Sequence, residues 1–119
     1  MRDVLPVPLR GCGTALITPF TASGAVDDAA LRALVEWQIA EGIDFLVPCG
    51  STGEAATLAL QEHLRVVAIT AEVVAGRIPV IGGAASNDTA KAIAMSKRLL
   101  ELGVFVIGFG YPVDRKSVV

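Results

Sequence analysis

The sequence predicts an α/β protein with a parallel sheet, and three observations support this fold class. Four short apolar runs, at residues 13–18, 43–47, 78–82 and 104–108, alternate with amphipathic helical patterns. Successive runs begin roughly 25 to 35 residues apart, which is the length of a βα unit. The composition is apolar, with 53% hydrophobic residues, as expected for parallel strands that are buried on both faces. About three βα units and a fourth strand are therefore expected.

The first expected helix follows an acidic pair. Asp27 and Asp28 can cap its first turn, where negative charge is favoured. Gly42 suits the left-handed conformation that ends many helices. The apolar positions between these signals recur at helical spacing, and they are Leu31, Leu34, Val35 and Ile39.

The second and third expected helices end at Gly76 and Gly103, and Asn87 with Asp88 should cap the third. The inner face of the second helix is expected to carry Leu64, Val67, Ala68, Ala71 and Val74. That of the third is expected to carry Ala92, Met95, Leu99 and Leu102. Pro79 is placed at the start of the third strand, where a missing N–H does least harm.

This order of elements predicts the amino-terminal half of an eight-fold (β/α) barrel. A complete barrel typically takes about 250 residues, whereas the chain has 119. A doubly wound sheet is the alternative, but the loop after the first run lacks a G-x-G-x-x-G phosphate signature. Half a barrel would leave its first and last strands as unpaired edges. The length therefore predicts a fragment.

The segment Gly50-Ser51-Thr52-Gly53-Glu54 is the most informative candidate site. It follows the second apolar run, so two hydroxyls and several backbone N–H groups should lie at the carboxyl end of a strand, where α/β folds bind ligands. Such a group of donors can bind a small carboxylate. The alternative is structural, because Ser51-x-x-Glu54 has the spacing of a helix capping box.

Composition excludes several classes of function. No stretch reaches the roughly 18 uninterrupted apolar residues of a membrane span. A net charge of −2 gives no basic stripe for nucleic acid. The start of the chain lacks a hydrophobic signal core, so a cytoplasmic protein is expected. Cys12 and Cys49 lie in or beside apolar runs and are predicted to be reduced core thiols. No metal site and no organic cofactor are expected.

Three motifs in order make the chain resemble a known enzyme family. They are Thr18-Pro19-Phe20, Gly50-Ser51-Thr52-Gly53-Glu54 with Ala56-Thr57-Leu58, and Asn87-Asp88-Thr89-Ala90. Together they resemble the dihydrodipicolinate synthase and N-acetylneuraminate lyase family of pyruvate-dependent TIM (β/α)8 barrel enzymes, over about residues 11 to 103. The second and third motifs are more similar to the synthase branch, whereas Ser51 occurs more often in the lyases.

The resemblance implies a lysine Schiff base with pyruvate, followed by condensation with aspartate semialdehyde in the synthases of lysine and diaminopimelate biosynthesis. By motif position, Thr52 and neighbouring N–H groups, including that of Gly53, would hold the pyruvate carboxylate. Ser51 would join a proton relay with two tyrosines. Ser in place of Thr keeps the hydroxyl but loses a methyl that restrains its rotamer. The full-length form would be a homo-oligomer, as a tetramer.

The family's catalytic lysine lies on a later strand that this chain does not contain. The resemblance therefore implies that this chain alone is inactive. A lyase acting on N-acetylneuraminate and a non-catalytic half-barrel are the alternatives. Lys91 and Lys97 fall on the third helix and are predicted to be solvated rather than to form an imine.

The residues after Gly103 depart from the family pattern. A Pro-Tyr-Tyr-Asn type motif would supply a relay tyrosine, but here Tyr111 precedes Pro112. Tyr111 is a catalytic candidate on position alone. Residues 114–119 can be encoded by GATCGGAAGAGCGTCGTG, which matches a widely used sequencing-library adapter. We therefore divide the chain into a partial barrel at 1–113 and a non-native tail at 114–119; other codons in the DNA would remove this argument.

His63 is the single histidine and is expected to be a surface or hydrogen-bonded residue of the second helix. In lysine-inhibited synthases the matching helix helps to form an allosteric site, and those enzymes carry an acidic residue where this chain has Lys91. A cation there would repel the ammonium group of lysine.

We therefore predict weak or absent feedback by lysine in an active full-length form. Titrating lysine into that enzyme should leave its rate unchanged. Half-inhibition at sub-millimolar lysine would contradict the prediction.

Overall fold

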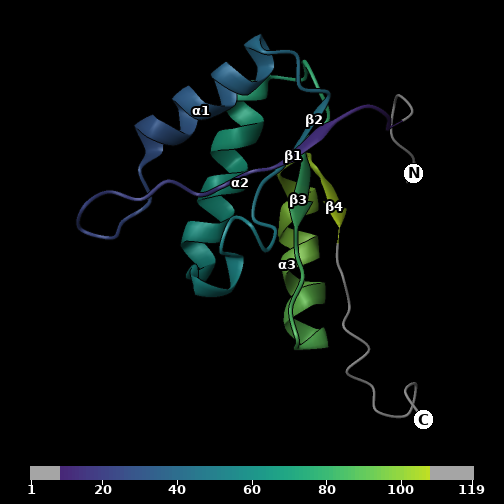
Figure 1. The fold of residues 1–119 in the computed structure, drawn as a ribbon. Coiled ribbons are helices and arrows are strands. Elements are labelled where there is room, and N and C mark those ends of the chain that lie inside the picture. Colours follow the sequence, from purple (N-terminus) through teal and green to yellow (C-terminus); the bar gives the residue numbers. More distant parts are fainter. Residues whose placement is uncertain (1–8, 108–119) are drawn as a thin grey trace.

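The computed structural model describes residues 9–107, which form four short strands and three long helices (Figure 1). The strands are β1 (Gly13–Ala15), β2 (Phe45–Val47), β3 (Ile81–Gly83) and β4 (Phe105–Ile107). The helices are α1 (Asp28–Ala40), α2 (Leu60–Val74) and α3 (Thr89–Glu101), with a 3₁₀ turn, η1 (Ala55–Thr57), before α2. The predicted alternation of strands and helices is confirmed.

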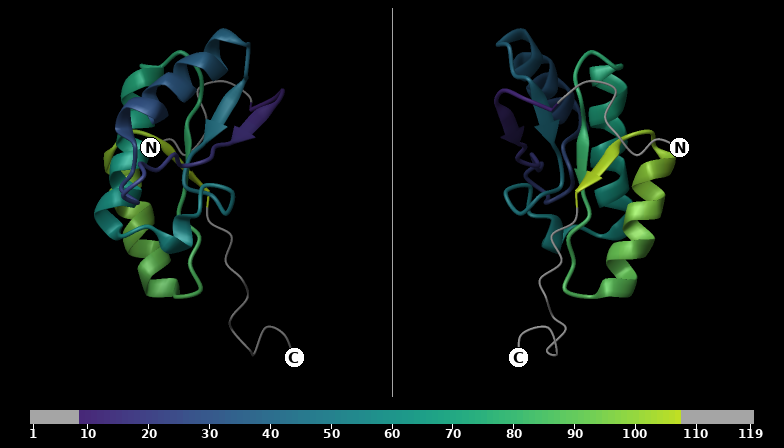
Figure 2. Two further views of the ribbon diagram at one scale, coloured as in Figure 1. Left: turned by 60° about the vertical axis from the view of Figure 1, so that its left-hand side comes forward. Right: turned by 90° about the vertical axis from the view of Figure 1, so that its right-hand side faces the viewer.

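All strand pairs are parallel and follow chain order. β1 pairs with β2 and β3 with β4. A bridge between Leu46 and Val80 joins the two pairs. Figure 2 shows α1, α2 and α3 on one side of the strands. A doubly wound sheet would place helices on both faces, so this arrangement is that of a barrel wall.

The hydrophobic core lies between the strands and the helices. Leu46 of β2 is fully buried, as are Leu31 and Val35 of α1. The remaining buried apolar members of this cluster are Leu16, Cys49, Val66, Val67, Ile69, Val74, Val80, Ala84, Leu99 and Val104. Burial of this one cluster holds the helices against the strands.

Some apolar side chains are not covered by the described residues. Ile17, just after β1, is 55% exposed, and Ile107 at the end of β4 is 36% exposed. On the helix side, Ile93 and Leu100 of α3 are 52% and 59% exposed. An incomplete barrel leaves such surfaces at its open side and beside its last helix.

Two predicted helix faces differ from the structure. In α2 the buried side includes His63, Val66 and Thr70, which the periodicity did not predict. In α3 Leu99 alone is buried, and Leu102 beyond its end is 38% exposed. The reason is that α2 packs between two neighbouring helices, whereas α3 has a helical neighbour on one side within residues 9–107.

The predicted helix ends are largely correct. Asp27 caps α1 by accepting a hydrogen bond from the N–H of Ala30, and Asp88 caps α3 by accepting one from Lys91. Gly42 and Gly103 adopt positive φ after α1 and α3. At the end of α2 the left-handed residue is Ala75, followed by Gly76 at φ +79°.

The first strand is shorter than predicted, since β1 ends at Ala15 rather than at residue 18. The third begins at Ile81, so Pro79 lies before it and its carbonyl accepts from Leu46 N. Cys12 is exposed, so its assignment as a core thiol was wrong. It precedes β1 and lies outside the layer between strands and helices.

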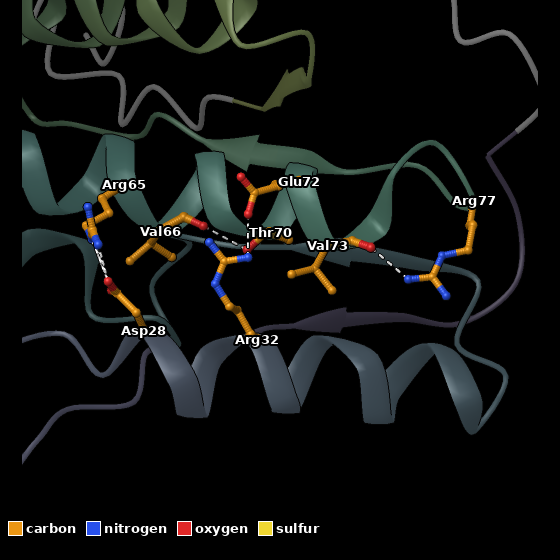
Figure 3. A network of polar contacts seen from close by, with 8 residues as sticks. All are labelled: Asp28, Arg32, Arg65, Val66, Thr70, Glu72, Val73 and Arg77. Carbon is orange, nitrogen blue, oxygen red and sulfur yellow. Dashed lines mark hydrogen bonds and ion pairs between the residues drawn. The ribbon is translucent and has the colours of Figure 1, made fainter.

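Charged side chains link α1 to α2 on the outer surface (Figure 3). Asp28 pairs with Arg65, and Arg32 pairs with Glu72. The Arg65 guanidinium lowers the pKa of Asp28 through a hydrogen bond. These pairs are solvent-exposed, and such pairs contribute little to stability. They fix the relative positions of two helices that the core already holds.

No helix among the described residues is both long enough and apolar enough to cross a membrane.

Truncating the fully buried Leu46 should strongly destabilise this fold. We expect Leu46→Ala to lower the free energy of unfolding by about 2–5 kcal/mol, because it removes buried methyl groups and leaves a cavity. Leu100→Ala, at a position 59% exposed, is the matched control and should change it by less than about 0.5 kcal/mol. Urea denaturation of the 119-residue chain measures both, and equal losses would contradict the assignment of the core.

Candidate functional site

The loop after β2 is held in an unusual backbone conformation. Cys49, which is buried, has φ +59°, and Glu54 at the other end of the loop has φ +58°. Non-glycine residues rarely adopt these values, and the strain persists only where surrounding structure imposes it. Such residues concentrate at ligand sites. The loop from Cys49 to Glu54 is therefore a candidate site on backbone geometry alone.

Gly53 anchors this loop to the residues just after β1. Its carbonyl accepts a hydrogen bond of 2.7 Å from Thr18 Oγ1, and Thr18 is 4% exposed. A Cβ at position 53 would lie 2.9 Å from the backbone oxygen of Leu16. Glycine is required here because the chain passes so close to β1.

Ser51 and Thr52 lie on the solvent side of the anchored loop. Both are exposed, whereas Gly53 is buried. Within residues 9–107, neither the hydroxyl nor the N–H of Ser51 or Thr52 has a hydrogen-bond partner. The N–H of Gly53, in contrast, donates to Gly50 O at 3.1 Å. The free donors are thus two hydroxyls and two N–H groups, a set suited to a carboxylate.

The capping-box alternative is wrong. The helix α2 begins at Leu60, with Ala59 at its N-cap position. Glu62 accepts a hydrogen bond of 2.8 Å from Ala59 N. A capping box also needs an N-cap side chain that accepts from the backbone N–H of the third helical residue, and alanine has no acceptor. Glu54 precedes η1 and makes no side-chain cap bond. Ser51 and Glu54 therefore do not cap a helix, and the hydroxyl of Ser51 is available for another role.

Family comparison and fold comparison give the same result. The model of the Dihydrodipicolinate synthetase family matches residues 8–108. A 4-hydroxy-tetrahydrodipicolinate synthase of Koribacter versatilis is 62% identical over 91 residues, covering 76% of this chain and 30% of the relative.

The chain belongs to the dihydrodipicolinate synthetase family. Among solved structures, a synthase of Methylacidiphilum fumariolicum matches with TM-score 0.83 and 42% identity, over 87% of this chain and 34% of that one. A dihydrodipicolinate synthase of Acinetobacter baumannii, solved with pyruvate, matches with TM-score 0.84 and 36% identity. The match covers 87% of this chain and 36% of that one. The chain spans about a third of the length of these relatives. Its strands are the first part of the family's TIM barrel.

His63 lies behind the loop in this member of the family. It is 6% exposed, and its Nε2 lies 2.7 Å from Gly83 O at the end of β3. Burial lowers its pKa, while the hydrogen bond to Gly83 acts in the opposite direction. Of the two expected states, surface or hydrogen-bonded, the structure shows the second.

Cys49 is a buried thiol rather than a nucleophile. Its Sγ lies 3.6 Å from His63 O, and burial raises its pKa to about 12. The thiolate is therefore absent at neutral pH. Cys49 and Cys12 are both free, as predicted.

The other predicted residues do not join the loop. Lys91 and Lys97 are exposed on α3, in agreement with the solvated role. Tyr111 and the proposed tail at 114–119 lie outside the described residues. Among residues 9–107 there is no cluster of three side chains suited to a metal ion.

Sequence reasoning missed Thr18, His63 and Gly83 as supports of the site. Thr18 opens the Thr18-Pro19-Phe20 motif at the end of the first apolar run, which was a usable signal. Nothing in the local sequence of His63 or Gly83 indicates that they meet, since they are separated by 20 positions.

The lowered pKa of His63 predicts a pH-dependent stability. Above the ordinary value of 6.5, the histidine is neutral in both folded and unfolded chains, so its contribution to stability is fully present. As the pH falls below 6.5, the unfolded chain binds the proton first and stability is lost. Urea unfolding at pH 8 and at pH 5 measures this effect. The free energy of unfolding should fall more between pH 8 and pH 5 for the wild type than for His63→Gln. Equal losses would contradict this contribution, because the other titrating groups are common to both proteins.

Proposed function

We propose that the protein to which this chain belongs is a 4-hydroxy-tetrahydrodipicolinate synthase. It would condense pyruvate with aspartate semialdehyde through a lysine Schiff base. The observation that carries the proposal is the exposed Ser51-Thr52 pair, whose N–H groups have no partner within residues 9–107, in a chain of this family. The pyruvate complex of the Acinetobacter baumannii relative supports the choice of substrate.

Thr52 would bind the pyruvate carboxylate. Its hydroxyl and N–H, with the N–H of Ser51, supply donors that are free within the described residues. Because they are held by the strained, anchored loop, little ordering is needed when the carboxylate binds. Gly53 takes part as the anchor of the loop, since its own N–H donates to Gly50 O.

Ser51 would pass a proton during imine formation. A relay requires short O–H···O contacts within about 3 Å, and Ser51 presents an exposed hydroxyl beside Thr52. The tyrosine partners of this relay, with Tyr111 as one candidate, and the imine-forming lysine would come from outside residues 9–107. Lys91 and Lys97 are not proposed for that role, because they are solvated on the outer helix α3.

The full-length protein would be a homo-oligomer, proposed here as a tetramer. One matched structure, 39% identical, is described as the first monomeric dihydrodipicolinate synthase variant, which implies that other members associate. An N-acetylneuraminate lyase activity is the second candidate, favoured by the serine at position 51. Two curated relatives, 62% and 50% identical, are named as synthases, which supports the first.

A chimera tests the proposed activity. Residues 9–107 would replace the matching segment of the Koribacter versatilis relative, which is 62% identical, so that the rest of the barrel is supplied. We expect the chimera to gain mass when pyruvate and borohydride are added, and the 119-residue chain alone to gain none. Thr52→Val should raise the KM for pyruvate by at least about tenfold, because a hydrogen bond to a charged group is lost. Thr89→Val, on the exposed first turn of α3, is the control.

Two outcomes would contradict the proposal. The first is a folded chimera that forms no pyruvate adduct. The second is an unchanged KM in Thr52→Val, which would remove the loop from the binding site. Aldehyde specificity, measured with aspartate semialdehyde and N-acetylmannosamine in the same chimera, separates the synthase from the lyase candidate.

A further inference from the structure

A buried histidine connects three backbone segments behind the Ser51-Thr52 loop. His63 belongs to the first turns of α2, and its side chain reaches the end of β3. Its Nε2 lies 2.7 Å from Gly83 O. A carbonyl can only accept, so Nε2 carries the hydrogen and donates. The contact therefore ties the outer helix to the strand end next to the loop.

The end of β3 in turn presses on the first residue of the loop. Gly83 N donates to Pro48 O at 2.9 Å. A Cβ on Gly83 would lie 2.2 Å from Cys49 O, so the two backbones are in direct contact. Any movement of Gly83 would therefore be transmitted to Cys49.

Cys49 is the residue at which the chain turns into the loop. Its φ of +59° is unfavourable for a side chain of this kind, so neighbouring contacts must hold it. One of these contacts also comes from His63, whose carbonyl oxygen accepts from Cys49 Sγ at 3.6 Å. His63 thus supports Cys49 twice, directly through its backbone and indirectly through Gly83.

We propose that His63 is a positioning residue for the Ser51-Thr52 loop: it locks Gly83 against Cys49 and so fixes the direction in which the loop leaves β2. It is not a catalytic residue, because its ring bonds to the backbone of β3 and, among the described residues, to no atom of Ser51 or Thr52. The link to pyruvate rests on the proposed function, whereas the effect on the loop does not.

Three variants of the 119-residue chain test whether His63 holds the loop in place through Gly83 and Cys49. His63→Phe keeps a ring but removes the donor, and His63→Gln restores a donor of different reach. Thr70→Val is the matched control. Thr70 is fully buried on the same helix and bonds to Val66 O at 2.8 Å, away from the loop (Figure 3).

The first measurement is amide hydrogen exchange. We expect His63→Phe to speed exchange of the Gly53 and Glu54 amides, which donate to Gly50 O and Ser51 O, by on the order of tenfold. Exchange in α1 should change much less. His63→Gln should lie between His63→Phe and the wild type, and Thr70→Val should leave the ratio of loop to α1 exchange unchanged.

The second measurement is the rate at which Cys49 reacts with a thiol reagent, with the exposed Cys12 as an internal reference. Cys49 should react faster in His63→Phe than in Thr70→Val. Three outcomes would each overturn the proposal. The first is a uniform rise in exchange across α1 and the loop, and the second is an equal effect of His63→Phe and Thr70→Val. The third is a wild-type chain without protected amides in β3.

The consequence for binding is tested separately in the chimera. There His63→Phe should raise the KM for pyruvate more than it lowers kcat, with partial rescue by His63→Gln. If the unmodified chimera binds no pyruvate, the proposed function fails, but the hydrogen-exchange result still shows whether His63 positions the loop. If the unmodified chimera is active and His63→Phe leaves the KM unchanged, the positioning role fails while the proposed function stands.

Discussion

The contact between β2 and β3 is the constraint on which the described structure depends. The strands form two parallel pairs, and these pairs are joined by Leu46 N to Pro79 O at 3.2 Å and by Gly83 N to Pro48 O at 2.9 Å. This seam allows one core to form beneath all four strands. It also brings the end of β3 against the residue where the candidate site begins. A side chain at position 83 would separate the two backbones, so glycine there serves both the sheet and the site.

The same seam explains how a strained loop can be maintained. Cys49 and Glu54 both have positive φ, each at a cost in free energy that local interactions do not repay. The compensation comes from contacts distant in sequence: Thr18 holds Gly53, and Gly83 lies against Cys49. Because these supports are buried, the exposed part of the loop is free to present its polar groups. Ligand sites at strand ends rest on this division between a rigid base and a solvent-facing rim.

The exposed apolar residues have a simple physical reading in a chain of this family. Ile17 and Ile107 lie at the strand ends, while Ile93 and Leu100 lie on α3. A barrel buries its inner face by closing and each outer helix by the next one. The Koribacter versatilis relative is about two and a half times as long as this chain, since 91 residues are 30% of it, and a complete barrel has further strands and helices that provide such cover. These surfaces are therefore part of a fold that the described residues build only in part.

The sequence by itself determined the order and type of the elements, because helical and strand periodicities, acidic caps and glycine stops are local signals. It also determined the family and the position of the Ser51-Thr52 loop. It placed Cys12 in the core wrongly. On α2 it identified the buried Val67 and Val74 but missed His63, Val66 and Thr70, since burial depends on which neighbour each side of the helix faces. The tertiary structure alone decided that Ser51-x-x-Glu54 is not a cap. It alone decided that His63, Thr18 and Gly83 support the loop, because those contacts join residues 20 to 35 positions apart and no local pattern encodes them.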